Sequence, residues 1–343
     1  MKRMLNTLYI TTQGARVSCE GDNIRIEVER ELKLRVPVHT LDGVVCFGRV
    51  FCTPPVLGLC ARHGVLVTFL SGKGRFLARV QGPVSGNVLL RREQYRRADC
   101  LESAAQIASV IVAAKAANAR TVLLRGARDH PGTPGADELR KAGDHLARLV
   151  QRFRRKPDLD TARGWEGEAA HVYFSVFDHL IVSQKEDFHF EERSRRPPLD
   201  NMNALLSFLY TLLAHDVVSA LESVGLDPAV GFLHRDRPGR PGLALDIMEE
   251  FRPVLADRVA LSLVNRKQVI GRGFVKTESG AVTMDEKTRR EVIVTWQKRK
   301  ADEIRHPFLG EKIPVGLIPF AQALLLARYL RGALDCYPPF FWK

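Results

Sequence analysis

Residues 81–119 read QGPVSGNVLLRREQYRRADCLESAAQIASVIVAAKAANA, and within this stretch the chain changes from strand-forming to helix-forming sequence. Gln81-Gly82-Pro83 is a turn signal that separates the two kinds of sequence. From Leu89 onward apolar residues recur at helical spacing, and residues 104–119 are rich in Ala, Ile and Val, which is typical of a buried helix. The stretch therefore predicts two domains of different class that meet after residue 82.

The sequence before residue 83 predicts a small β-sandwich. Its β-prone runs are short and are separated by turn signals, the last of them at residues 71–74. Residues 24–29 alternate apolar and charged side chains, so one face of that strand is exposed to water. Residues 56–63 predict a short helix. The predicted strands are residues 7–12, 16–19, 23–28, 32–37, 43–47 and 66–70.

The sequence after residue 82 predicts a larger, all-helical domain. The expected fold class is therefore α+β, with domains at residues 1–82 and 83–343. Asn201 is the expected N-cap of a long apolar helix that stops at Gly225. Pro253 is expected to bend the helix that contains it. The helices are predicted at residues 104–119, 136–155, 164–182, 201–224, 243–264 and 320–330.

The charge balance bears on the partners of the protein. The chain carries 52 Lys and Arg against 39 Asp and Glu, a net charge of +13, with a pI of about 9.7. This excess favours a polyanion, either nucleic acid or an anionic membrane surface. The longest apolar runs, such as residues 204–214, are too short to span a bilayer, and residues 1–14 contain no export signal. We therefore expect a cytoplasmic protein that binds nucleic acid and has no membrane partner.

Glu166 lies in the first of three segments that could carry chemistry, residues 164–174, GWEGEAAHVYF. The segment predicts the opening of a helix, which places Glu166 near the helix start. Gly167 beside it would let a bulky ligand, such as a phosphate backbone, approach closely. The alternative is that Glu166 only complements the positive end of the helix.

His234 lies in the second segment, residues 230–241, VGFLHRDRPGRP. An apolar run leads to this single histidine on a loop rich in Gly, Pro and Arg, where it could bind a metal or act as an acid or base. The alternative is a histidine at the edge of the core with one hydrogen bond. Arg235, Arg237 and Arg240 suit contact with phosphate better than catalysis.

Asp246, Glu249 and Glu250 lie in the third segment, residues 243–253, LALDIMEEFRP. Helical spacing places both glutamates one turn from Asp246. Acids that crowd an otherwise apolar turn repel one another unless a cation neutralises them, and the cation could be a metal ion or Arg252. The alternative is a solvated acidic face.

Together the three segments supply two or three carboxylates and one imidazole. Oxygen ligands select Mg²⁺ or Mn²⁺, and a single histidine favours Mn²⁺. The segments contain no cysteine, and the six cysteines of the chain form no C-x-x-C pair, which argues against zinc or an iron–sulfur cluster. A divalent ion of this kind polarises a phosphoryl oxygen and activates an attacking hydroxyl.

In their order and spacing, the three segments resemble the CRISPR-associated adaptation integrase family (CRISPR-associated protein 1). The resemblance extends over most of the chain, because residues 43–48 and 64–74 resemble the family's N-terminal strands. Residues 322–340 resemble the ending of one subfamily, type I-C. The family's motifs fall on Gly164-x-Glu166-Gly167, Gly231-Phe232-x-His234 and Asp246-x-x-Glu249.

The resemblance implies that Glu166, His234 and Glu249 bind the metal, with Asp246 as an accessory acid beside them. It implies a homodimer, with the N-terminal β-sandwich as its dimerisation domain and a small CRISPR-associated adaptation subunit bridging two dimers. Some relatives act with a separate iron–sulfur exonuclease. The implied activity is that of a DNA endonuclease and integrase, in which the 3′-hydroxyl of a short foreign fragment attacks a phosphodiester of a repeat array. That exchange needs no energy source, and the sequence contains no G-x-x-x-x-G-K-[ST] phosphate loop.

Basic residues are expected to hold the double-stranded DNA, although a solvated surface charge is the simpler interpretation of any one of them. Two rival functions use the same residues: a non-catalytic DNA-binding scaffold, and a hydrolytic nuclease of branched DNA. The proline-rich tail, residues 337–342, is expected either to dock a partner or to pack against its own domain. The candidate DNA contacts are Arg235, Arg237, Arg240, Arg266, Lys267, Arg289, Arg290, Lys298, Arg299, Lys300 and Arg305.

Overall fold

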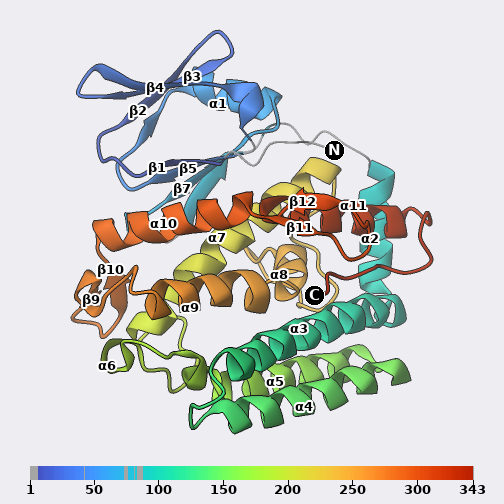
Figure 1. The fold of residues 1–343 in the computed structure, drawn as a ribbon. Helices are drawn as coiled ribbons and strands as arrows, with labels where there is room; N and C mark the ends of the chain where they lie inside the picture. The colour runs from blue at the N-terminus through green and yellow to red at the C-terminus, as the bar shows by residue number, and fades with distance from the viewer. Residues whose placement is uncertain (1–6, 42, 73–75, 81, 83–87, 343) are drawn as a thin grey trace. The chain divides into compact units, whose positions relative to one another are not determined.

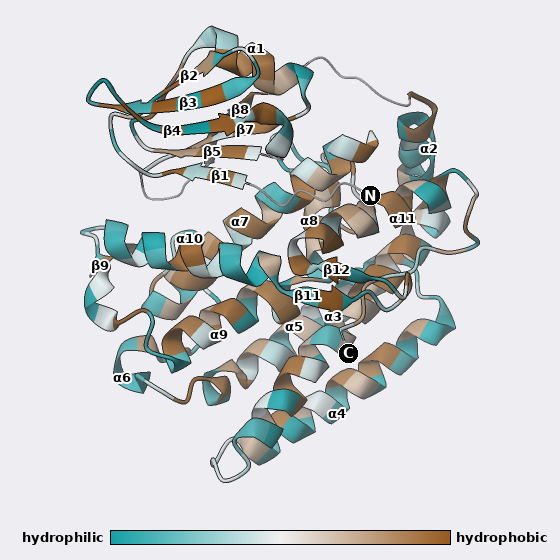
Figure 2. Cartoon of the chain, turned by 45° about the horizontal axis from the view of Figure 1, so that its top comes forward, coloured by the Kyte–Doolittle hydropathy of each residue, from teal (hydrophilic) through white to brown (hydrophobic). Residues whose placement is uncertain are grey.

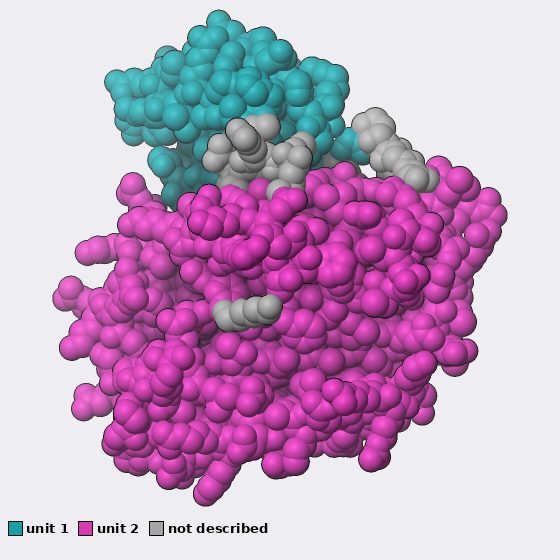
Figure 3. Space-filling model, turned by 45° about the vertical axis from the view of Figure 1, so that its right-hand side comes forward, with its two compact units in different colours: residues 1–86 teal, residues 87–343 magenta. Residues whose placement is uncertain are grey.

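The computed structural model describes residues 7–41, 43–72, 76–80, 82 and 88–342. The chain forms two compact units, residues 1–86 and 87–343 (Figure 3). The domain boundary predicted after residue 82 falls among residues 81–87, most of which lie outside the described residues. Two residues of the predicted turn, 73 and 74, also lie outside them.

The N-terminal unit contains two four-stranded sheets and one helix, α1 (Pro54–Arg62). Apolar residues of both sheets and of α1 pack into one cluster, which includes Val17, Ile24, Val44 and Leu59. The first sheet has the order β1 (Thr7–Ile10), β5 (Gly43–Phe47), β7 (Leu66–Leu70) and β8 (Phe76–Val80), and β1, β5 and β7 are parallel. The second has the order β4 (Glu31–Pro37), β3 (Asn23–Val28), β2 (Arg16–Glu20) and β6 (Phe51–Cys52).

All six strands predicted in this unit are present, within two residues of the predicted bounds. Two strands were not predicted. β6 has only two residues, which is too short for a pattern, and β8 follows the predicted turn at residues 71–74. The arrangement of the two sheets as a sandwich stays a prediction.

The C-terminal unit is mainly helical. Helices α3, α4 and α5 lie side by side, and α3 also packs against α8, so one helix touches the two that carry the acidic motifs (Figure 1). The helices are α2 (Val88–Asp99), α3 (Leu101–Asp129), α4 (Ala136–Arg152), α5 (Leu159–Ser175), α6 (Lys185–Phe188), α7 (Asn201–Val224), α8 (Gly242–Glu249), α9 (Arg258–Asn265), α10 (Glu286–Ala301) and α11 (Ile318–Leu330).

The expectation of an all-helical C-terminal domain is wrong in detail. Two small antiparallel hairpins occur in it, β9 (Phe274–Lys276) with β10 (Val282–Met284), and β11 (Glu303–Arg305) with β12 (Lys312–Pro314). Each strand has only three residues, too few for alternation to be recognised. Helix α10 was also not predicted, because its charged residues are spread around the helix instead of forming one face. Figure 2 shows hydrophilic segments along much of α10, interrupted by hydrophobic ones.

Three details of the helices, one start, one cap and one bend, differ from the sequence prediction for reasons of capping and backbone geometry. Helix α5 begins at Leu159, before Gly164, because the Asp158 carboxylate accepts a hydrogen bond from the Thr161 amide at 2.7 Å. Asp200, the residue before Asn201, caps α7 in the same way. The bend expected at Pro253 is a π-helical segment, Arg252–Asp257, between α8 and α9.

Among the described residues, two helices are long and apolar enough to cross a membrane by length and composition alone, α3 and α7. The expectation that no apolar run reaches that length is therefore wrong. In both helices most of the apolar window is buried inside the unit, 67% for α3 and 61% for α7. This is the burial expected of core helices.

Candidate active site

The three acids of the α8 region point in three different directions. Asp246 is fully buried, and its Oδ2 accepts hydrogen bonds from the backbone amides of Phe232 at 2.5 Å and Leu233 at 2.9 Å. Its Oδ1 accepts from the backbone amide of His234 at 3.0 Å. One carboxylate therefore fixes the backbone of the loop that carries the histidine.

Gly231 allows that loop to lie against α8. A Cβ atom at this position would come within 2.7 Å of Oδ2 of Asp246 and 2.7 Å of the carbonyl carbon of Gly242. Since such distances are shorter than any normal contact, only glycine fits here without displacing the carboxylate. The motif Gly231-Phe232-x-His234 is therefore a packing requirement as well as a chemical one.

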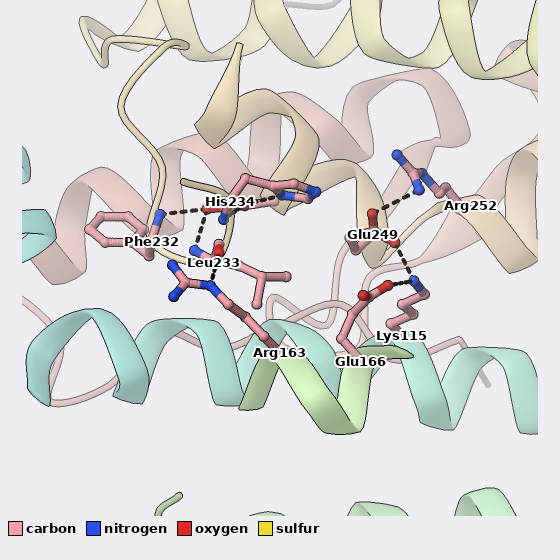
Figure 4. A network of polar contacts seen from close by, with 9 residues as sticks. Lys115, Arg163, Glu166, Phe232, Leu233, His234, Glu249 and Arg252 are labelled. Atoms are coloured by element: carbon pink, nitrogen blue, oxygen red, sulfur yellow. Dashed lines mark hydrogen bonds and ion pairs between the residues drawn. The ribbon is translucent and has the colours of Figure 1, made fainter. Parts of the chain in front are cut away.

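The imidazole of His234 is also held by Asp246. Its Nδ1 lies 2.6 Å from Oδ1 of Asp246, so Nδ1 is the donor and Nε2 is left as the ring's second functional atom. In Figure 4 the ring extends toward Glu249. From the other side, Nε of Arg163 on α5 donates to the Leu233 carbonyl at 2.7 Å.

Glu166 and Glu249 share a cation that the motifs did not reveal. The ammonium of Lys115, from the middle of α3, donates to Oε1 of Glu166 and lies 2.7 Å from Oε2 of Glu249 (Figure 4). On its other side, Oε1 of Glu249 lies 2.8 Å from Nη1 of Arg252. Glu249 is 1% exposed and Lys115 is 8% exposed, so these charges are shielded from water.

The electrostatics keep this group ionised. Burial by itself raises the pKa of Glu249, but the charges of Arg252 and Lys115 outweigh it and lower the pKa to about 2. Burial likewise lowers the pKa of Lys115, and the carboxylates of Glu249 and Glu166 more than compensate, so that its pKa rises above the usual value. Both shifts favour the charged forms, which agrees with a salt bridge.

Glu250 faces away from this group, although it is the next residue along the chain. Its carboxylate accepts from the Phe340 amide at 2.7 Å and the Tyr337 hydroxyl at 2.8 Å. Burial raises its pKa to about 8. The tail, residues 337–342, therefore packs against its own domain, with Tyr337 and Phe340 buried.

Glu166 does not lie where the sequence analysis expected it. Because α5 begins at Leu159, Glu166 lies in the middle of the helix and cannot complement the helix start. Gly164 and Gly167 are exposed and have open space around them, which is compatible with close approach of a ligand to this face.

The donor set suits a hard divalent cation, with two carboxylates and one imidazole whose Nδ1 is already used. In the part of the chain that the structure describes, however, no three His, Cys, Asp or Glu side chains converge closely enough to hold a metal. Lys115 lies between the two carboxylates instead. The metal-binding role of Glu166, His234 and Glu249 stays a prediction.

Lys115 was not predicted as a site residue, although the sequence around it is unusual. It is a lone charge in the run Val112-Ala113-Ala114-Lys115-Ala116-Ala117 of a helix predicted to be buried. A lysine at such a position needs an anionic partner. Its spacing from the acidic motifs carries no information, because the partners come from other helices.

Most of the predicted DNA contacts present their charge to solvent, and two do not. Arg289 and Lys300 are buried, and Lys300 pairs with Asp216 at 2.8 Å, so these two are the least accessible of the eleven candidates; both stay predictions. The other nine stay predictions; Arg240 and Arg299 are half-buried, and Arg235, Arg237, Arg266, Lys267, Arg290, Lys298 and Arg305 are exposed.

A groove of about 1020 Å³ opens beside His234. Its walls come from the first turns of α3, residues 153–163, the loop at residues 231–236 and the C-terminal residues 335–337. It gives a large substrate access to one side of the site.

Comparisons with known proteins identify the family of the chain. The chain matches the family described as CRISPR associated protein Cas1 over residues 8–298. It is 54% identical over 343 residues to CRISPR-associated endonuclease Cas1 1 of Chlorobaculum tepidum, and 53% identical over 347 residues to CRISPR-associated endonuclease Cas1 2 of Rhodospirillum rubrum; both matches cover 100% of each chain.

The fold is similar to that of a CAS1 protein from Thermotoga maritima, with a TM-score of 0.81 at 22% identity, covering 98% of this chain and 100% of the other. A casposase bound to an integration product has a similar fold, with a TM-score of 0.81 at 22% identity. That match covers 96% of this chain and 91% of the casposase chain. The family expected from the three motifs is thus confirmed. The chain belongs to the Cas1 family of CRISPR-associated endonucleases.

Proposed function

We propose that this endonuclease inserts short duplex DNA fragments into a CRISPR repeat array, with Glu166, His234 and Glu249 as ligands of one Mg²⁺ or Mn²⁺ ion. One observation carries the proposal. Asp246 fixes both the loop and the ring of His234, so that the imidazole extends toward Glu249, while Glu249 and Glu166 are held together by one cation.

The chain's own residues prepare the site in three ways. Asp246 sets the tautomer of His234 and leaves Nε2 for a ligand. Arg252 keeps Glu249 ionised and in place. The groove beside His234 leaves this residue open to a ligand on one side. When bound, the divalent ion would stabilise negative charge on the phosphoryl group as a 3′-hydroxyl replaces the leaving oxygen.

The net charge of +13 and the exposed cations support binding of double-stranded DNA. We expect the logarithm of the binding constant to fall linearly with the logarithm of salt concentration, with a slope of about −0.9 per phosphate neutralised. Titrations of labelled duplex at four or more salt concentrations measure this slope. An affinity independent of salt would contradict a phosphate-backbone interface.

The partners are proposed from the relatives. Solved complexes contain Cas1 with Cas2, and relatives in Rhodospirillum rubrum and Geobacter sulfurreducens are fusions of an exonuclease, Cas4, with Cas1. We propose that this chain forms homodimers through a β-sandwich in its N-terminal unit, that a Cas2-like subunit bridges two dimers, and that a separate iron–sulfur exonuclease acts with them in the cytoplasm. The resemblance of residues 322–340 supports type I-C.

The test is strand transfer by Glu166→Ala, His234→Ala and Glu249→Ala. Each change should abolish joining of a fragment to repeat DNA and leave duplex binding largely intact, and excess EDTA should have the same effect. Glu168→Ala is the matched control, because Glu168 lies on the same helix but pairs with His145 and Arg152. It should retain activity.

The same assay separates the rival functions. Products that are cut but not joined, with and without a Cas2-like subunit, would indicate a hydrolytic nuclease of branched DNA. DNA binding without any metal-dependent product would indicate a scaffold. Activity that survives in excess EDTA would remove the metal from the proposal.

A further inference from the structure

Lys115 lies at the centre of the site, yet neither the motifs nor the reaction account for it. It projects from an apolar part of α3, between the fully buried Ala114 and Ala116. Figure 4 shows its ammonium between the carboxylates of Glu166 and Glu249. Removing a lysine from water is costly, and here two carboxylates from two other helices compensate for that cost.

The charges around Lys115 are balanced before any metal is added. Two carboxylates, Glu166 and Glu249, face two cations, Lys115 and Arg252. A divalent ion added to this group would leave two excess positive charges in a site where Glu249 and Lys115 are buried. Like charges repel strongly where water is excluded.

The distances also indicate that a metal and the ammonium of Lys115 cannot both occupy this position. A Mg²⁺ ion shared by both carboxylates must lie about 2.0–2.1 Å from their oxygens. The ammonium already lies within hydrogen-bonding distance of one oxygen of each carboxylate. Both oxygens of Glu249 already face a cation, Oε2 the ammonium of Lys115 and Oε1 the guanidinium of Arg252, so a metal bound to Glu249 would compete with one of them.

We infer that Lys115 is a positioning residue whose ammonium holds Glu166 and Glu249 together in the metal-free protein and withdraws when the divalent ion binds. The inference rests on the proposed metal site. The lysine side chain is a flexible four-carbon stem, so its ammonium can leave the carboxylates without movement of α3. The free energy of metal binding is then the difference between two states: one in which the metal neutralises Glu166 and Glu249, and one in which the ammonium of Lys115 does.

The experiment is a Mn²⁺ titration of the full chain without DNA, by isothermal titration calorimetry. Lys115→Met removes the competing charge and leaves the acids with Arg252 alone. We expect Mn²⁺ to bind about ten-fold more tightly than to the wild type, or about 1.4 kcal/mol. In EDTA the variant should unfold at a lower temperature, and Mn²⁺ should raise its Tm by more than that of the wild type. Lys115→Gln repeats the measurement should the methionine variant not fold.

Two variants control for charge and for burial. Lys115→Arg keeps the positive charge and should bind Mn²⁺ no more tightly than the wild type. Lys300→Met removes another buried lysine, 6% exposed and paired with Asp216, far from the acids in sequence and contacts. It should lower stability and leave Mn²⁺ affinity unchanged.

The outcomes separate the inference from the function on which it rests. If the wild type binds Mn²⁺ and both uncharged Lys115 variants bind it equally or more weakly, Lys115 does not compete with the metal and the inference is wrong. If the wild type itself binds no Mn²⁺, the proposed metal site is wrong. Tighter binding by Lys300→Met as well would assign the effect to loosened packing and would also overturn the inference.

Discussion

Replacing Asp246 with Asn tests whether this carboxylate organises His234, the proposed metal ligand. The two side chains have the same shape, but Asn has one accepting oxygen and one donating NH₂ group. In the wild type, Oδ2 accepts from two backbone amides and Oδ1 accepts from the amide and ring of His234. Whichever way the amide turns, its NH₂ group faces two donors.

The expected loss of stability follows from the two donors that lose their acceptor. A buried donor left without its acceptor costs about 1–3 kcal/mol, so Asp246→Asn should lower the free energy of unfolding by between about 2 and 6 kcal/mol. This is a large part of the roughly 5–15 kcal/mol that stabilises a typical domain. Loss of the group that orients a ligand histidine typically lowers activity or metal affinity about 10–100-fold.

Urea unfolding followed by circular dichroism measures the first effect, and strand transfer at a temperature where the variant is folded measures the second. Asp227→Asn is the control, because Asp227 accepts only from Ala229 and Tyr95 at exposed positions. It should change stability by less than about 1 kcal/mol. Wild-type stability together with wild-type activity in Asp246→Asn would refute the assignment.

Three further changes test other parts of the site. Gly231→Ala places a Cβ 2.7 Å from Oδ2 of Asp246 and should lower the free energy of unfolding by about 1–3 kcal/mol in urea, with a matching loss of strand transfer. Burial raises the pKa of Asp257 from 3.8 to about 6, so the folded state holds this proton more tightly than the unfolded state. Stability should therefore fall by up to about 3 kcal/mol as pH rises from about 4 to 6, and Asp257→Asn should remove that slope in urea titrations at several pH values. A chain ending at Cys336 loses two donors to Glu250 and should unfold about 2–6 kcal/mol more easily; unchanged thermal stability would mean that the tail does not anchor this region.

Local patterns were sufficient for most of the elements. Alternation and turn residues located the main strands of the N-terminal unit, and apolar periodicity located α3, α4, α7 and α11. The predicted helix boundaries were wrong where a single side chain determines the end of the helix. Helix α5 starts five residues before Gly164, because the carboxylate of Asp158 caps it.

For the site, sequence identified the motif residues but not all of their contacts. Asp246 was expected beside the proposed metal ligands, and it contacts one of them, His234, whose loop and ring it holds. Glu250 was expected on the same acidic face, and it binds the C-terminal tail. Spacing along one helix shows which side chains are neighbours, but it does not show which distant segment satisfies each of them.

The region around α8 shows why no single segment could predict this site. It carries three acids on a short apolar helix and its C-terminal turn, and each acid is satisfied by a different part of the chain. Asp246 binds the loop before the helix, Glu249 binds Lys115 and Arg252, and Glu250 binds the tail. Every buried carboxylate needs such a partner, because an unpaired one would cost several kcal/mol. The partners of one helix thus tie the start, middle and end of the C-terminal unit together, and the functional acids are placed by the same contacts that stabilise the unit.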